Sequence, residues 1–327
     1  KISIQADTDV WLEYAGEKGI HGAILSYLSL KKENFYMVEN TVDGKFFVTA
    51  RGWEDLSEIL KSYEELQVEI GEELIGEFLQ KEEIARDFAG YYRLYEKYKS
   101  DYQIQEILDG NVISGQLKTC CDMGKKASFE ERFAVTEMLL EAVTERISVF
   151  QKIDEKTEKL YENLKLLKIF LQEKNSVEAM EQFVASRRKA LDAKICSELL
   201  TAEEAAREEE QIRILEEYFF QLKELHISDV AEGIEQIGER FGNVCRLRNE
   251  KLEETKKMLE QAFSFLEECF GEGQELLLFE TGLTGDDRCS IFISQYGCPS
   301  YFKHCELLLY SKKENELRKE CRDLLEE

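Results

Sequence analysis

Apolar residues recur at helical spacing along most of the chain. Over residues 52–66 they fall every three or four positions, which predicts a helix with one buried face. The same spacing predicts helices at about 72–80 and 82–100, and short helices joined by loops within residues 1–32. The 82–100 helix carries a stripe of apolar and aromatic side chains at Ile84, Phe88, Tyr91, Tyr92, Tyr95 and Tyr98. We interpret this stripe as core rather than as a cofactor site.

One stretch near the N-terminus breaks the helical pattern. Two aromatic and β-branched runs, residues 34–39 and 45–49, flank the pair Asp43-Gly44. An Asp-Gly pair between two such runs is a strong hairpin-turn signal. We therefore predict a β-hairpin over residues 34–49.

Long helices are predicted over residues 128–272. From Leu140 to Leu171 apolar residues recur at intervals of three and four, with Thr157 in the one gap, which is typical of a coiled-coil-like seam. These helices are expected to pack as antiparallel hairpins or a bundle. Helix-start signals, each a hydroxyl or amide/carboxylate residue ahead of an apolar run, occur at Ser128, Asn175, Thr201 and Asp229.

These patterns predict a mainly α protein in four segments. One proline and 19 glycines are too few for a sandwich, barrel or propeller, which need many turns. The segments are an N-terminal helical domain containing the hairpin, a linker, the long-helix bundle and a C-terminal helical cap, at residues 1–110, 111–127, 128–272 and 273–327. Within the cap, residues 281–284 are predicted to form a turn into a helix.

The net charge of the chain limits the kinds of molecule that it can bind. The chain has 43 basic and 68 acidic residues, a net charge of −25, so phosphate backbones and anionic lipid surfaces would repel it. We expect no nucleic-acid partner and no membrane insertion. The acidic run over residues 203–210 is interpreted as a solvated helix face, and the alternative is a docking surface for a basic partner.

The number and spacing of the cysteines do not indicate a disulfide framework. Nine of them, an odd number, are scattered along the chain, and no signal peptide is visible at its start, so we expect free thiols and a cytoplasmic protein. Cys289, Cys298, His304 and Cys305 are chemically suited to zinc, but their spacing is not that of a finger or ribbon. We interpret them as small buried groups and predict no metal ligand.

The sequence contains no recognisable catalytic motif, so we predict no catalytic residue. The nearest string to a phosphate-binding loop, Gly124-Lys125-Lys126, lacks the first glycine and the hydroxyl that would bind magnesium. Serine-hydrolase elbows and His-Glu-x-x-His are absent from the sequence. A thiol-dependent or zinc enzyme is the weakest alternative.

One run, residues 45–57, is distinctive: Lys-Phe-Phe-Val-Thr-Ala-Arg-Gly-Trp-Glu-Asp-Leu-Ser. It resembles the segment of MoxR-like AAA+ ATPases in which an apolar run enters an Arg-x-Trp-Glu-x-Leu-Ser helix start and opens the helical lid. By this match Arg51 is the sensor-2 candidate, the one site residue we predict, although many relatives have proline where this chain has Ala50. The resemblance covers about residues 1–110 and 265–310.

The resemblance implies that this chain is part of a larger ATPase. In that family the Walker A, Walker B, sensor 1 and arginine-finger residues belong to an α/β core, which we expect upstream of Lys1. ATP and magnesium would bind to the full-length parent, and this chain alone would neither bind them tightly nor hydrolyse ATP. Members commonly form hexameric rings and act as chaperone-like remodellers, often with von Willebrand A-type partners. The alternative is a stand-alone acidic helical adaptor with no nucleotide role.

Overall fold

The computed structural model describes residues 7–41, 44–110, 114–171 and 175–305. Their regular structure is helical apart from one two-stranded antiparallel sheet. The predicted mainly α fold with a small β-hairpin is therefore confirmed. Among the described helices, none has both the length and the apolar character needed to cross a membrane.

The chain divides into two compact units. Unit 1 comprises residues 1–147 and 256–327, and unit 2 comprises residues 148–255. Two long helices, α8 (Phe129–Phe170) and α11 (Val230–Phe270), contribute to both units. The division into four segments drawn from the sequence stays a prediction.

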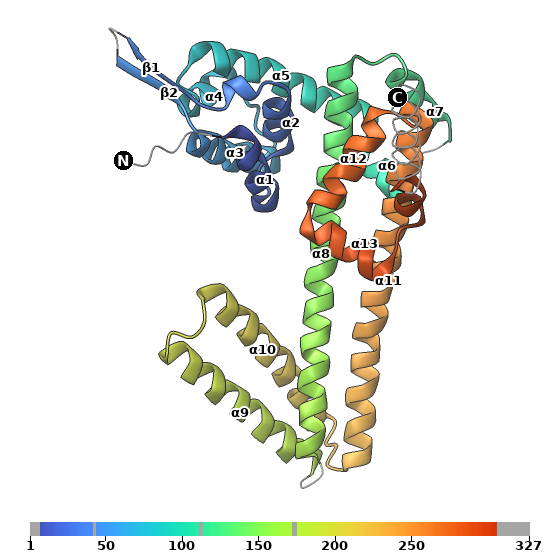
Figure 1. Ribbon diagram of the computed structural model, residues 1–327. Helices are drawn as coiled ribbons and strands as arrows, with labels where there is room; N and C mark the ends of the chain where they lie inside the picture. The colour runs from blue at the N-terminus through green and yellow to red at the C-terminus, as the bar shows by residue number, and fades with distance from the viewer. Residues whose placement is uncertain (1–6, 42–43, 111–113, 172–174, 306–327) are drawn as a thin grey trace, which may run out of the picture. The chain divides into compact units, whose positions relative to one another are not determined.

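The N-terminal part of unit 1 is a set of short helices and the hairpin (Figure 1). Tyr27, Trp53 and Phe88 meet in its core, with ring centroids 5.2, 5.3 and 5.8 Å apart. Phe88, Tyr92 and Tyr95 are buried, which confirms that the aromatic stripe belongs to the core. The elements are α1 (Thr8–Lys18), α2 (Gly22–Leu30), the 3-10 helix η1 (Lys32–Asn34), β1 (Met37–Thr41), β2 (Gly44–Val48), α3 (Ala50–Glu65), α4 (Glu72–Phe78), α5 (Glu82–Tyr102), α6 (Ile104–Asp109) and α7 (Ser114–Gly124).

The hairpin leads directly into α3. Met37 of β1 pairs with Val48 of β2 in antiparallel register, and the turn residues 42–43 lie outside the described residues. Thr49 then caps α3, because its hydroxyl oxygen accepts a hydrogen bond of 3.2 Å from the Gly52 amide. The cap places the helix start at Ala50 rather than at the predicted residue 52.

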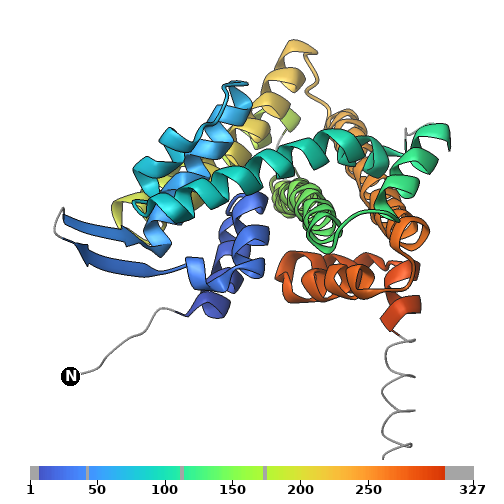
Figure 2. The ribbon, with the colours of Figure 1, turned by 90° about the horizontal axis from the view of Figure 1, so that it is seen from above.

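The C-terminal part of unit 1 contains α12 (Gln274–Gly285) and α13 (Asp287–Tyr296). Both lie beside the first half of α8 and the end of α11, as Figure 2 shows from above. Phe263 of α11 and Phe279 of α12 meet edge to face, with ring centroids 5.3 Å apart. This contact joins α12 to the end of α11 through fully buried rings.

The turn predicted at residues 281–284 is wrong, because these residues lie inside α12. The hydroxyls of Thr281 and Thr284 donate to carbonyls one turn earlier in the helix, each at 2.7 Å, so neither opens a turn. Gly282 is there for packing: a Cβ at this position would lie 2.2 Å from Leu140 Cδ2 of α8. The Thr-Gly pattern reflects a close helix crossing rather than a chain reversal.

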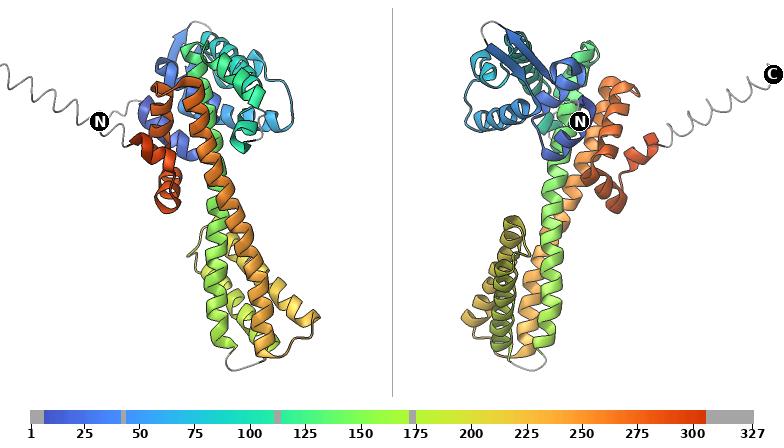
Figure 3. Two further views of the ribbon diagram at one scale, coloured as in Figure 1. Left: turned by 90° about the vertical axis from the view of Figure 1, so that its right-hand side faces the viewer. Right: turned by 60° about the vertical axis from the view of Figure 1, so that its left-hand side comes forward.

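Unit 2 is built from α9 (Ser176–Cys196), α10 (Ala202–Glu224), the second half of α8 and the first part of α11 (Figure 3). The predicted starts are confirmed: Asn175 accepts from the Glu178 amide, and Thr201 forms a capping box with Glu204. All four helices contribute to one apolar core, which includes Leu160, Leu167, Phe183, Leu215, Leu222 and Ile237. The long helices thus pack as predicted.

Candidate functional site

Arg51 lies in the first turn of α3, immediately after the hairpin. Its side chain is 87% exposed, and its ion pair is with Asp55 one turn later, with Nε 3.5 Å from Oδ2. A pair this long between two exposed groups holds a side chain weakly. The guanidinium is therefore held loosely at the surface of unit 1.

The two residues after Arg51 have structural roles. A Cβ at Gly52 would lie 2.8 Å from the Phe78 carbonyl oxygen, so glycine allows the start of α3 to approach the end of α4. Trp53 is fully buried, and its indole N–H donates to the Phe35 carbonyl at 3.1 Å. Both residues anchor the helix start and thereby fix where Arg51 emerges.

A partly buried polar cluster lies at the other end of α3. Glu64, in the last turn of α3, accepts hydrogen bonds from three side chains of two other segments. His21 Nε2 lies 2.7 Å and Tyr92 Oη 3.0 Å from Glu64 Oε1, and Lys99 Nζ lies 2.9 Å from Oε2. The sequence pattern singled out Tyr92 as a core residue but not this cluster, because 28 to 43 positions separate Glu64 from its partners.

His21 caps α2 with its imidazole. Nδ1 accepts from the Ala23 amide at 3.1 Å, and this bond requires a lone pair on Nδ1. Nε2 then carries the proton that is donated to Glu64, and this tautomer is assigned from the bonding pattern. Burial raises the pKa of Glu64, but the hydrogen bonds from His21 and Lys99 outweigh it and lower the pKa to about 2.

A second carboxylate of this region, Glu141 of α8, holds the start of α2. It accepts from the Gly22 amide and the Tyr95 hydroxyl, each at 3.0 Å. A Cβ at Gly22 would lie 2.0 Å from Glu141 Oε2, so only glycine allows this approach. One turn earlier, the half-buried Glu137 makes no hydrogen bond or ion pair with a described residue. Burial and the Glu141 charge raise the pKa of Glu137 to about 7.

Glu137→Gln should stabilise the protein at alkaline pH. With a pKa raised from 4.5 to about 7, the wild-type carboxyl loses stability as the pH rises through that window. The amide does not ionise, so we expect a gain of roughly 1–3 kcal/mol at pH 8, discounted for partial exposure, and almost none near pH 4.5. Urea unfolding at both pH values measures it, with the exposed Glu145→Gln as control. A gain that does not depend on pH would contradict the assignment.

The zinc-type residues near the C-terminus have separate partners. Cys289 Sγ lies 3.4 Å from the Thr144 hydroxyl, Cys298 Sγ 3.3 Å from Glu260 Oε1, and His304 Nε2 2.5 Å from Glu267 Oε1. Within the described ranges, no group of three or more His, Cys, Asp or Glu side chains could hold a metal ion. The interpretation as small buried groups fits Cys289, Cys298 and His304, which are all buried, whereas Cys305 is half-buried.

The expectation of free thiols alone is wrong. Cys121 of α7 and Cys269 of α11 form a disulfide across 148 residues, while Cys120, Cys196, Cys245, Cys289, Cys298 and Cys305 are free. Cys321 lies outside the described residues. Spacing along the chain gives no hint of this pairing, because it depends on how α7 folds onto the end of α11.

Part of the acidic run on α10 is paired with basic residues within unit 2. Glu208 pairs with Lys194 of α9 and Glu210 with Lys156 of α8, at 2.5 and 2.9 Å. Arg188 of α9 lies 4.0 Å from Glu209 of the run and 2.6 Å from Glu216, which follows the run. These pairs favour the solvated helix face over the docking-surface alternative.

Comparison with family models, with curated proteins and with solved structures gives no match to this chain.

Proposed function

We propose that this chain is the lid and helical extension of a MoxR-like AAA+ ATPase, in which Arg51 senses bound ATP. The observation that supports the proposal is the setting of Arg51: an exposed, weakly paired guanidinium in the first turn of a capped helix. Free amides at a helix start favour anions, and the forked donors of arginine suit a phosphate. The MoxR-like pattern of residues 45–57 supplies the ligand class.

In this proposal the chain supplies one positively charged side chain, Arg51, and the rigid helix start that positions it. Magnesium and the phosphate cradle would belong to the upstream α/β core, which places and activates the terminal phosphate of ATP. Arg51 would exchange its weak pair with Asp55 for that phosphate, and the buried Trp53 would carry the change in position to the lid core. The ring homo-oligomer and the von Willebrand A-type partner are parts of the same proposal.

The first test is the coding sequence upstream of Lys1. A Gly-x-x-x-x-Gly-Lys-[Ser/Thr] motif between a strand and a helix supports the proposal. A stop codon there, with a start codon near Lys1, supports the acidic adaptor instead.

Arg51→Ala in the full-length ATPase should lower the steady-state ATP turnover. A hydrogen bond to a charged group contributes about 1.5–3 kcal/mol, so losing it in the transition state gives a fall of roughly tenfold to a hundredfold. Arg51→Lys keeps the positive charge but loses the forked pair of hydrogen-bond donors, so its ATP turnover should lie between those of the wild type and Arg51→Ala. The exposed Arg93→Ala on α5 is the matched control. Unchanged turnover in a folded Arg51→Ala variant would remove Arg51 from the nucleotide site.

A further inference from the structure

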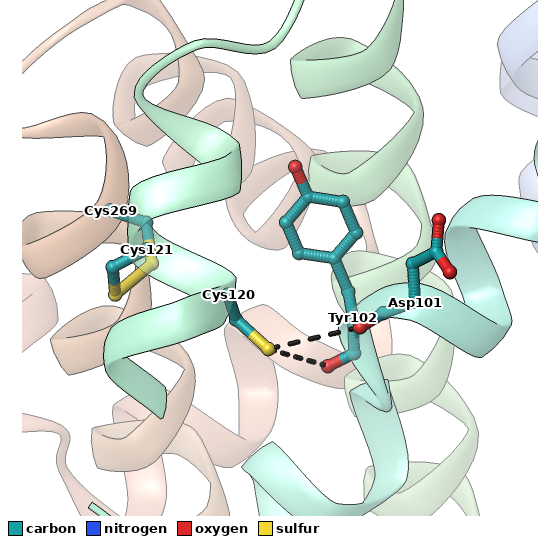
Figure 4. Close-up of a disulfide and its surroundings, with 5 residues drawn as sticks. All are labelled: Asp101, Tyr102, Cys120, Cys121 and Cys269. Atoms are coloured by element: carbon teal, nitrogen blue, oxygen red, sulfur yellow. Dashed lines mark hydrogen bonds between the residues drawn. A yellow bond between two sulfur atoms is a disulfide. The ribbon is translucent and has the colours of Figure 1, made fainter. Parts of the chain in front are cut away.

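The disulfide fastens a short helix to the end of a long one. Cys121 lies in α7, and Cys269 is one residue from the end of α11 (Figure 4). A Cβ at Gly124 would lie 2.8 Å from Phe270 Cε1 and 3.6 Å from Cys269 Cβ. The last turns of α7 and α11 are therefore in direct contact beside the disulfide.

Little else in the described part of α7 is buried. Over residues 117–124, Cys120, Cys121 and Gly124 are buried, Leu117 and Met123 are half-buried, and Lys118 and Asp122 are exposed. Two thiol-sized side chains and a glycine bury little apolar surface, and hydrophobic stabilisation scales with that surface. The disulfide is therefore one of the contacts that hold α7 on α11, beside the packing of Gly124 against Phe270.

Cys120 attaches the same helix to a different neighbour. Its thiol donates to the carbonyl oxygens of Asp101 and Tyr102, at 3.8 and 3.9 Å, in the last turn of α5. Figure 4 shows the adjacent cysteines pointing to different sides of α7. Burial raises the pKa of the Cys120 thiol, so it remains protonated and does not attack the neighbouring disulfide.

The state of the remaining cysteines indicates whether this disulfide is structural or redox-responsive. Six described thiols are free, and one of them, Cys196, is exposed. A single disulfide among many free thiols differs from the disulfide framework of a small secreted domain. Where thiols are kept reduced, disulfides in proteins are usually transient and respond to redox conditions.

We propose that Cys121–Cys269 is a reversible thiol–disulfide site whose reduction releases α7 from the last turn of α11, while Cys120 keeps α7 on the end of α5. The reductant is a dithiol, either a protein or a small molecule. This inference does not depend on the nucleotide proposal, because it uses only contacts within unit 1.

Reduction proceeds by thiol–disulfide exchange through a mixed disulfide. One thiolate of the dithiol attacks the Cys121 sulfur, since Cys121 is the more accessible partner at 6% exposure against 1% for Cys269. A mixed disulfide forms, and Cys269 leaves as a thiolate that takes up a proton. The second thiolate of the dithiol then closes on the first, expelling Cys121 as a thiolate that is also protonated. The dithiol becomes a disulfide, having given two electrons and two protons, and the reverse sequence restores the bond.

The test uses the full chain equilibrated in mixtures of reduced and oxidised dithiothreitol. Alkylation followed by peptide mass mapping gives the fraction of Cys121–Cys269 disulfide in each mixture. Amide hydrogen exchange on the same samples follows the α7 peptide. We expect a reversible transition between the two forms, with exchange in α7 at least tenfold faster in the reduced form and unchanged in α3 and α5.

Two variants test the roles of Cys121 and Cys120 separately. Cys121→Ser should show fast exchange in α7 under all conditions, whereas Cys120→Ser should keep the redox response. Three outcomes would overturn the proposal: no disulfide in oxidised dithiothreitol, α7 exchange that does not change on reduction, or reduction only when all of unit 1 exchanges together. All three outcomes are measured on the wild-type chain in its reduced and oxidised forms. A variant that fails to fold therefore does not weaken the test.

Discussion

Trp53→Ala is expected to lower the free energy of unfolding of unit 1 by about 3–5 kcal/mol, the usual cost of removing a large aromatic side chain from a core. Trp53 is fully buried, meets Phe88 edge to face and lies 5.8 Å from the Tyr27 ring centroid. Its loss also leaves the Phe35 carbonyl without the indole N–H that it now accepts. Urea unfolding followed by the fluorescence of Trp11, the other tryptophan of the chain, measures the change.

Trp53→Phe separates the two contributions. It keeps most of the ring volume and loses the hydrogen bond, so we expect a smaller loss of about 1–2 kcal/mol. Leu66→Ala, at a side chain that is 71% exposed at the end of the same helix, is the matched control and should change stability by less than about 0.5 kcal/mol. A loss below 1 kcal/mol for Trp53→Ala would show that Trp53 is not a core residue.

Local signals predicted those parts of the fold that depend on neighbours in sequence. The hairpin was predictable because Gly44 lies between two β-rich runs, and the starts of α9 and α10 because Asn175 and Thr201 bond amides three residues on. Gly282 misled the turn prediction, since the residue that needs its small size, Leu140, is 142 positions away in sequence. Glycine signals a turn or a close approach, and sequence spacing does not separate the two.

The polar cluster and the disulfide could not be predicted for the same reason. His21 and Glu64 each look ordinary in sequence, and only the packing of α2 against α3 and α5 brings them together. Cys121 and Cys269 likewise become partners only through the fold of unit 1. Arg51 is different, because both its position at a helix start and its ion pair with Asp55 one turn later follow from local sequence.

Glu64 and Glu137 show how one buried region gives two carboxylates opposite pH behaviour. Both are removed from water, which by itself raises the pKa of each. Three donors surround Glu64, whereas Glu137 faces the like charge of Glu141. Burial is the main cause of the raised pKa of Glu137, with the Glu141 charge second, whereas at Glu64 the donors outweigh burial and lower the pKa.

Glu64→Gln is expected to destabilise unit 1 by about 2–4 kcal/mol at pH 7, because it removes the charge that Lys99 pairs with and weakens the bonds from His21 and Tyr92. The wild-type pKa of Glu64 is lowered from 4.5 to about 2, so its stabilisation is complete above pH 4.5 and is lost as the pH falls toward 2. The difference between variant and wild type should therefore shrink over that window. Urea unfolding at pH 7, 4 and 3, followed by tryptophan fluorescence, measures it. Glu65→Gln, the exposed neighbour, should show no such trend, and a constant difference across these pH values would mean that Glu64 acts through packing rather than through its charge.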